Sequence, residues 1–186
     1  KGAGYKGARL VCAEAEVASG PVNTTKANFL IPSTDRVIED GELVMVELAT
    51  VVDGYYSDLT YMAIAGEPSD RQREVHNAVL EAQQAASRQM VPGNSYEDPD
   101  IAARKVLDDA GLGKYFVHVT GHGLGFRFHE STPFLMPGAS GTLKEGIVSS
   151  IEPGVYIPGF GGIRIEDNVA VGRDGPDFLS TPRQPW

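Results

Sequence analysis

Histidines gather in one short segment of this 186-residue chain. Three of the four, His118, His122 and His129, fall within a twelve-residue window, and Glu130 follows directly. Imidazole nitrogens and carboxylate oxygens bind transition metals and also accept protons during hydrolysis. The glycines between these histidines lack a Cβ, so they let the backbone come close to a ligand. The window therefore indicates metal-dependent hydrolysis rather than a packed core.

Isolated carboxylates also interrupt the apolar, β-rich segments of the chain. These residues are Glu47, Asp58, Glu152 and Glu166. A carboxylate in a half-buried strand is costly unless it is paired or binds a metal. Together with the imidazole of His122, four carboxylates could bind two divalent ions that share a water molecule and lower its pKa. Mixed oxygen and nitrogen ligands suit manganese, cobalt, zinc or iron.

Each of these residues taken alone has a simpler explanation. A single aspartate in a strand, such as Asp58, is usually an edge or turn residue. Glu166 could form a solvated ion pair with Arg164 that contributes little energy, and His122 could be an ordinary loop histidine. The joint pattern favours a metal site, because several such residues in apolar segments are improbable by chance.

A β-hairpin is predicted to position the first two carboxylates. Two segments rich in β-forming residues flank Asp53-Gly54, a dipeptide typical of two-residue hairpin turns. With such a turn, Ala49 lies opposite Asp58, and Glu47 is diagonal to it. Because side chains alternate along a strand, Glu47 and Asp58 then share one face and could reach the same ion.

Two helices are predicted between the β-hairpins. Ser69 and Gln72 form a capping-box pattern, and the first helix stops before Pro92. Its apolar residues at helical spacing are Val75, Val79, Ala82 and Ala86. The second helix begins with Asp98 as its cap. Strands are predicted over residues 43–49, 55–64, 116–120, 148–157 and 163–171. A central block of helices between β-hairpins favours the α+β class.

The composition limits the partners that this chain could bind. Its 25 acidic and 16 basic residues give a formal net charge of −9, and a nucleic-acid surface would need clustered Lys and Arg. No apolar run approaches the ~20 residues of a membrane span, so neither nucleic acid nor membrane is expected as a partner. The single Cys12 excludes an intrachain disulfide and favours a reducing, cytoplasmic compartment, with the thiol buried as a small apolar residue.

Four motifs, in this order along the chain, closely resemble those of the pita-bread metallopeptidases: GYYSDLT, HVTGHGLGFRFHE, IEPGVY and GIRIED. This group includes methionine aminopeptidases, Xaa-Pro aminopeptidases and prolidases. The resemblance implies an α+β fold with a curved antiparallel sheet covered by helices. It also implies that residues 1–186 form a single catalytic domain lacking its N-terminal portion and any separate N-terminal domain. The three histidines and the short interval between Glu152 and Glu166 resemble the proline-specific, prolidase-like branch.

The resemblance also implies a role for each site residue. The implied metal ligands are Glu47, Asp58, His122, Glu152 and Glu166. Glu152 would also accept a proton from the attacking water, while His118 and His129 would contact the substrate or stabilise the tetrahedral intermediate. Arg164 would support the site or bind the substrate carboxylate. The implied cofactors are two divalent metal ions, with manganese preferred over cobalt or zinc. The implied partners are a proline-containing dipeptide or peptide and a second copy of the chain in a homodimer.

Several positions depart from the family pattern near this site. Glu47 stands where the family has an aspartate, and its extra methylene moves the carboxylate outward by roughly a bond length. Tyr61 stands where an arginine is common, and Asn168 where a threonine is usual. Many relatives carry a substrate-facing histidine at residues 26–32, where Asn28 is the nearest polar candidate in this chain.

Hydrolysis of the peptide bond before proline in Xaa-Pro dipeptides is the leading hypothesis. An Xaa-Pro aminopeptidase acting on longer peptides is an alternative, as is a metal-free relative of the creatinase type. A catalytically impaired pseudoenzyme that acts as a binding module is the alternative from a different class. Glu47 and Tyr61 favour the pseudoenzyme, whereas the other four implied metal ligands argue against it.

Overall fold

The structure is a computed structural model that describes residues 10–26, 34–181 and 183–186, so Asn28 lies outside the described residues. Its strands are β1 (Leu10–Ser19), β2 (Leu43–Val52), β3 (Tyr55–Ile64), β4 (Gly121–His122), β5 (Phe134–Leu135), β6 (Val148–Ile151), β7 (Gly154–Ile157), β8 (Gly161–Arg164), β9 (Asp167–Val171) and β10 (Pro176–Phe178). Its helices are α1 (Gly20–Asn23), α2 (Asp70–Ser87), α3 (Asp98–Asp109) and the 3-10 helix η1 (Gly113–Tyr115).

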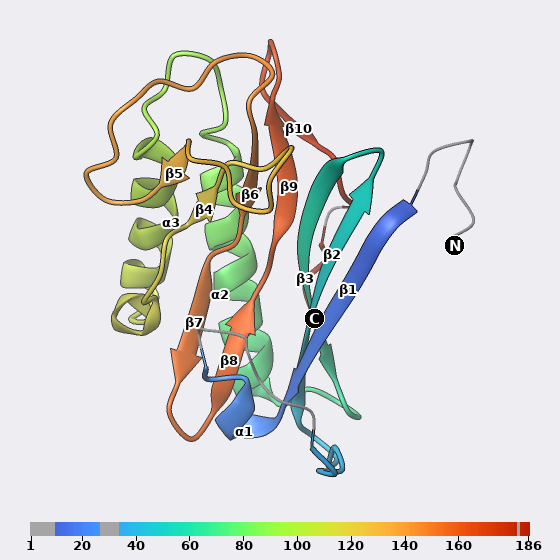
Figure 1. Ribbon diagram of the computed structural model, residues 1–186. Coiled ribbons are helices and arrows are strands. Elements are labelled where there is room, and N and C mark those ends of the chain that lie inside the picture. The colour runs from blue at the N-terminus through green and yellow to red at the C-terminus, as the bar shows by residue number, and fades with distance from the viewer. Residues whose placement is uncertain (1–9, 27–33, 182) are drawn as a thin grey trace.

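All strand pairs among the described residues are antiparallel. One sheet has the order β1-β2-β3, a second has the order β10-β9-β6, and β7-β8 and β4-β5 are two-stranded. The strand β3 contacts both β8 and β9, which joins the first sheet to the others. Figure 1 shows α2 and α3 on one side of β6–β9, with the β1-β2-β3 sheet on the other. The expected α+β architecture of antiparallel strands covered by helices is confirmed.

The turn between β2 and β3 is formed by Asp53 and Gly54, as predicted. Both residues have positive φ angles, 51° and 89° respectively. Two consecutive residues in this conformation form the turn whose twist matches that of a two-stranded antiparallel ribbon. Aspartate tolerates the left-handed region better than most residues, and glycine enters it at no steric cost. This local chemistry sets the register of the hairpin.

The predicted caps and core positions of α2 are present. The Ser69 hydroxyl accepts from the Gln72 backbone N–H at 3.3 Å, and the Gln72 side-chain oxygen accepts from the Ser69 N–H at 2.8 Å. For α3 the cap is Glu97 rather than Asp98, whose carboxylate instead accepts from the Ser95 N–H at 2.6 Å. The core between helices and strands includes Val75, Val79, Ala82, Ala86, Leu107, Ile151, Val155, Ile163, Ile165 and Val169.

Two further sequence predictions are wrong. Residues 116–120 form no strand, because the Arg104 guanidinium on α3 bonds the carbonyls that a neighbouring strand would otherwise bond. It donates to the oxygen of Phe116 at 3.3 Å and to that of His118 at 2.8 Å. Cys12 is exposed rather than buried. Its side chain lines a cleft of about 300 Å³ over the β1-β2-β3 sheet. The acidic residues that line the same cleft keep that face of the sheet hydrated.

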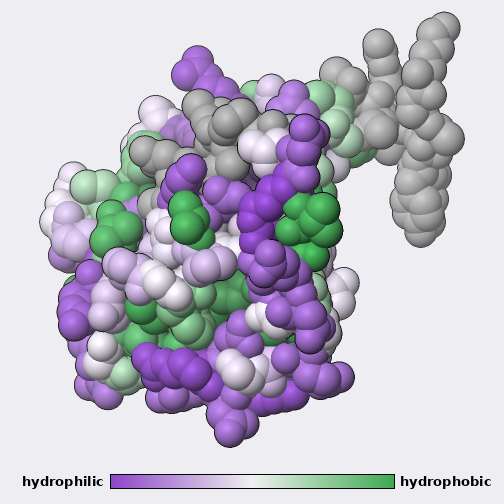
Figure 2. Space-filling view, turned by 90° about the horizontal axis from the view of Figure 1, so that it is seen from below, coloured by the Kyte–Doolittle hydropathy of each residue, from purple (hydrophilic) through white to green (hydrophobic). Residues whose placement is uncertain are grey.

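The outer surface is mixed in character. Seen from below, hydrophilic residues surround small, separate apolar patches (Figure 2). None of the helices among the described residues combines the length and the apolar character that crossing a bilayer requires.

Candidate active site

The register of the β2–β3 hairpin confirms the geometric prediction for the first two carboxylates. Ala49 pairs with Asp58, and Glu47 pairs with Thr60. Directly opposed residues in an antiparallel pair project to the same face, as do residues two positions apart. Glu47 and Asp58 therefore share the face of the hairpin that Thr60 also occupies.

Three potential metal ligands converge from strands that are distant in sequence. Asp58 lies on β3, His122 ends β4, and Glu166 lies between β8 and β9. One ligand atom from each lies within 4.8 Å of the others, and the three residues are 3%, 2% and 1% exposed. Such a group could hold a small cation, because its oxygen and nitrogen atoms converge on one point.

A fourth side chain joins this cluster from the end of β6. An oxygen of the half-buried Glu152 lies 3.3 Å from His122 Nε2, which is also 3.5 Å from Asp58 Oδ2. The Ser150 hydroxyl donates to Glu152 Oε1 at 3.0 Å and accepts from the His122 backbone N–H at 3.1 Å. Ser150 thus orients two residues of the cluster at once.

The hydrogen bonds of the cluster leave acceptor atoms for a cation. Asp58 Oδ1 and Glu166 Oε1 are buried and have no hydrogen-bond partner among the described residues. Glu166 Oε2 accepts from the Thr60 hydroxyl at 2.7 Å. His122 Nδ1 lies 3.1 Å from the Gly123 carbonyl oxygen, which can only accept. Nδ1 therefore donates to that oxygen, and Nε2 faces the carboxylates, which is the ring orientation of a metal-binding histidine.

The electrostatics of the cluster also favour a cation. Burial raises the pKa of Glu166 well above its ordinary value, and the charges of Glu152 and Asp58 raise it further. Burial lowers the pKa of His122, but Asp58 and Glu152 outweigh this and raise it overall. Both shifts reflect an excess of negative charge in a poorly solvated place. A divalent cation would neutralise that excess, so these residues fit the metal that the donor set implies.

Glu47 lies apart from this three-residue group. Its carboxylate accepts from the guanidinium of Arg164, whose Nε donates to the Thr60 hydroxyl at 2.9 Å. Arg164 is only 4% exposed, and an unpaired buried guanidinium would be costly. The structure therefore gives Glu47 a second role, as the counter-ion of Arg164. Its role as a metal ligand stays a prediction.

The two flanking histidines lie in different surroundings. His118 Nδ1 is 2.7 Å from the Val119 carbonyl, and its Nε2 is 2.8 Å from the Tyr156 hydroxyl. Burial lowers the pKa of His118, so its ring is neutral and Nε2 accepts from Tyr156. His129 is exposed, and its ring centroid lies 4.0 Å from that of His122. His129 thus adjoins the cluster from the solvent side.

Two side chains that organise the site were not assigned roles from the sequence. Tyr156 is buried, which raises the pKa of its hydroxyl to about 12, and the Arg164 charge opposes that rise. Asn168 bonds the backbone of Asp58 twice: its Oδ1 accepts from the N–H at 3.1 Å, and its Nδ2 donates to the carbonyl. Tyr156 belongs to the IEPGVY motif, which is a signal for it. For Asn168, the one sequence signal was that it stands where the family usually has a threonine.

Two glycines of the histidine motif are required by the backbone that packs against them. A Cβ on Gly121 would lie 2.0 Å from the Ser150 carbonyl oxygen, and one on Gly123 would lie 2.4 Å from that of Thr132. Both contacts are far too short for any side chain. Glycine is therefore required here because β4 passes close to β6 and to the loop before β5.

These features define an α+β protein whose antiparallel strands bring buried carboxylates and one imidazole into a candidate metal centre. The chain belongs to metallopeptidase family M24, whose family model matches residues 4–173. The pita-bread fold expected from the four motifs is thereby confirmed.

Individual relatives are similar over most of this chain. An Xaa-Pro dipeptidase of Lactobacillus helveticus is 45% identical over 149 residues, which are 80% of this chain and 40% of that protein. The structure of a prolidase from Pyrococcus furiosus has a TM-score of 0.85 and 37% identity, covering 91% of this chain and 49% of that one. The structure of dipeptidase PepE from Mycobacterium ulcerans has a TM-score of 0.88 and 38% identity, covering 95% of this chain and 47% of that one. The chain thus spans less than half the length of these relatives.

Proposed function

We propose that this chain carries the catalytic centre of a metal-dependent hydrolase that cleaves the peptide bond before proline in Xaa-Pro dipeptides. The convergence of Asp58, His122 and Glu166 carries the proposal, together with two buried carboxylate oxygens that have no hydrogen-bond partner within the described part of the chain. The names of the relatives support the substrate class, since they include Xaa-Pro dipeptidases and a prolidase.

The residues that would hold the metal are those of the cluster. Asp58, His122 and Glu166 would provide the first set of ligands, with Glu152 and Glu47 adding two further carboxylates. Five side chains are enough for two divalent ions, for which we propose manganese, with cobalt and zinc as alternatives. When bound, such ions would lower the pKa of water and polarise the scissile carbonyl.

The remaining steps fall to the side chains themselves. Glu152 is half-buried, so it can receive the proton of an attacking water while Ser150 and His122 hold it in place. His118 is neutral and fixed by Tyr156, and His129 faces solvent beside the cluster. Both can contact the substrate, and His129 can donate to the oxyanion that develops on the carbonyl. Arg164 would support the site through Glu47 and Thr60, or bind a substrate carboxylate in place of Glu47.

Finer assignments are part of the same proposal. Proline has no amide N–H, so its peptide bond differs in shape and hydrogen bonding from other bonds. A histidine-lined site can select for that difference, which supports an Xaa-Pro specificity. A homodimer in the cytoplasm is proposed from the family resemblance and from the single cysteine.

Substitution of cluster residues tests the function. In manganese-loaded protein, Asp58→Asn and His122→Ala should each lower the cleavage of Xaa-Pro dipeptides by more than about 100-fold, because each removes a direct ligand. The matched control is Asp109→Asn, since that carboxylate is 68% exposed on α3 and pairs with the exposed Lys105. Its activity should equal that of the wild type.

The same assay separates the alternatives. Unchanged cleavage by either cluster variant in a metal-repleted assay would sink the assignment. Fewer than about one tightly bound ion per chain, with no manganese-dependent cleavage, would favour the pseudoenzyme instead. Cleavage of longer Xaa-Pro peptides but not of dipeptides would identify an Xaa-Pro aminopeptidase.

A further inference from the structure

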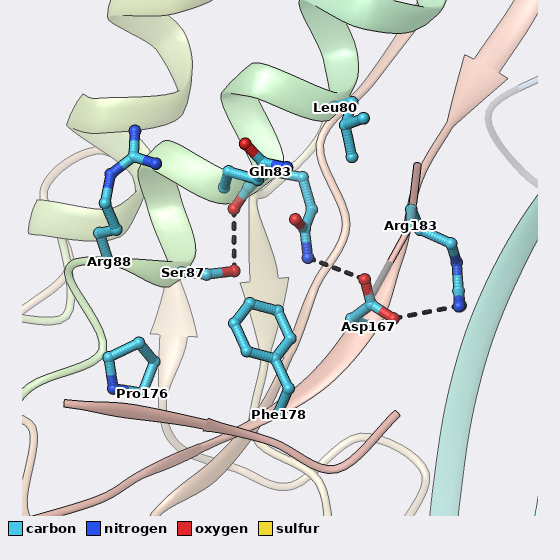
Figure 3. A pocket seen from close by; sticks show the side chains of 9 residues that line it. Leu80, Gln83, Ser87, Arg88, Asp167, Pro176, Phe178 and Arg183 are labelled. Atoms are coloured by element: carbon cyan, nitrogen blue, oxygen red, sulfur yellow. Dashed lines mark hydrogen bonds and ion pairs between the residues drawn. The ribbon is translucent and has the colours of Figure 1, made fainter. Parts of the chain in front are cut away.

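A buried carboxylate directly follows the cluster residue Glu166. Asp167 begins β9 and is 1% exposed. Its Oδ2 accepts from the side-chain amide of Gln83 at 3.0 Å, and its Oδ1 accepts from the Ser180 hydroxyl at 2.6 Å. Figure 3 shows this carboxylate in the wall of a cavity of about 230 Å³, between Gln83 on α2 and Arg183 near the C-terminus.

Arg183 is the cation that approaches this carboxylate. Its Nη2 lies 3.1 Å from Asp167 Oδ1 and donates to the backbone carbonyl of Glu166 at 3.1 Å. Its guanidinium carbon lies 3.8 Å above the centre of the Tyr61 ring. The side chain is only 12% exposed, so these contacts are largely shielded from water. Arg183 therefore contacts Tyr61 on β3, Glu166, and Asp167 at the start of β9.

We propose that Arg183 is a positioning residue for the metal centre, which it serves by holding Glu166 and Asp167 against Tyr61 on β3. The proposal rests on the proposed function, because it assumes that Glu166 binds metal. Arg183 lies beyond residues 4–173, the part of the chain that the family model matches. A segment outside that match thus completes the support of a central ligand.

The physical argument concerns the freedom of Glu166. Its side chain can meet the cluster only if its backbone is held, and its N–H already bonds the Thr60 carbonyl at 3.3 Å. Arg183 bonds the carbonyl on the other side of the same residue, so both ends of its backbone are anchored. The guanidinium also supplies positive charge beside Asp167, which lies next to an already acidic cluster.

The stacking on Tyr61 explains why arginine suits this position. A planar guanidinium can lie flat on an aromatic ring while it donates in its own plane. Lysine has a single rotating ammonium and would keep the charge without this geometry. Arg183→Lys should therefore preserve only part of the effect.

Manganese affinity of the metal-free protein, measured by isothermal titration calorimetry, tests this proposal. Arg183→Ala should weaken Mn²⁺ binding by about tenfold or more, as losing a group that orients a metal ligand does. The Mn²⁺ affinity of Arg183→Lys should lie between those of Arg183→Ala and the wild type. Arg173→Ala is the matched control, because that guanidinium is 80% exposed and should leave the affinity unchanged.

A purely structural role would give a different result. It would lower the thermal midpoint of the metal-free protein but leave Mn²⁺ affinity, measured well below that midpoint, at the wild-type value. At saturating Mn²⁺ the KM for an Xaa-Pro dipeptide should stay unchanged, since the proposed role of Arg183 acts on Glu166 and not on the substrate. A folded Arg183→Ala protein with wild-type affinity for Mn²⁺ overturns the proposal.

Two substitutions at Tyr61 keep the test decisive if Arg183→Ala does not fold. Tyr61→Ala removes the stacking surface and should weaken Mn²⁺ binding, whereas Tyr61→Phe keeps the ring and should not. Wild-type affinity in both Tyr61→Ala and Arg183→Lys overturns the proposal. A wild-type protein that binds no Mn²⁺ overturns the proposed function as well, so the two failures are distinguishable.

Discussion

The side-chain amide of Asn168 holds the backbone of Asp58 as a neighbouring strand would. It bonds both the N–H and the carbonyl of that residue across the contact between β9 and β3. Asn168 is 5% exposed and Asp58 is 3% exposed, so water cannot easily replace the amide. Asn168→Ala removes both hydrogen bonds and leaves two backbone groups of Asp58 buried without a partner.

The magnitude follows from those two groups. A buried polar group that loses its partner costs about 1–3 kcal/mol, so the two together lower the free energy of unfolding by about 2–6 kcal/mol. With a urea m-value of about 2 kcal/mol/M, the unfolding midpoint falls by about 1–3 M. Since Asp58 also loses its anchor, we expect Mn²⁺ affinity to fall by about tenfold.

Urea denaturation of the metal-free protein, followed by circular dichroism, measures the stability loss. The control is Asn77→Ala, because Asn77 is exposed and its contacts are long, at 3.4 Å. Asn77→Ala should change the free energy of unfolding by no more than about 0.5 kcal/mol. Asn168→Thr should be intermediate, since one hydroxyl can replace only part of the amide. A midpoint for Asn168→Ala within about 0.25 M of the wild type would refute the reasoning.

Two further substitutions address the departure at Glu47 and the start of α2. If Glu47 is a metal ligand, Glu47→Asp should retain or raise the amount of manganese bound per chain, measured by elemental analysis. A lower amount would contradict that role and leave Glu47 as the counter-ion of Arg164. Ser69→Ala removes the capping box and should cost about 1 kcal/mol, which lowers the thermal midpoint by about 2–4 °C. An unchanged midpoint would contradict the contribution of this cap.

Local features of this protein could be predicted from the sequence alone. Asp53-Gly54 determines a two-residue turn, and the turn determines that Ala49 pairs with Asp58. The helix start at Ser69 follows from side chains that bond backbone groups three residues away. These predictions succeed because the interacting groups are close in sequence, so few conformations compete with the native one.

Irregular segments could not be predicted in the same way. Residues 116–120 have a strand-like composition, but Arg104 on α3 binds their carbonyls and replaces the strand partner. Cys12 has an apolar side chain, but it faces a cleft rather than the core. In both cases the conformation or exposure depends on the residues that pack against the segment, and local sequence propensity carries no information about them.

The sequence by itself thus determined the family, the hairpin that carries Glu47 and Asp58, and the order of the motifs. Only the tertiary structure decided which side chains meet. It brings Asp58, His122 and Glu166 together, pairs Glu47 with Arg164, and places Arg183 against Glu166 and Tyr61. These contacts join residues far apart in the chain. They form only when separate sheets pack, and burial makes an unpaired charge costly, which favours the pairs of Arg164 with Glu47 and of Arg183 with Asp167.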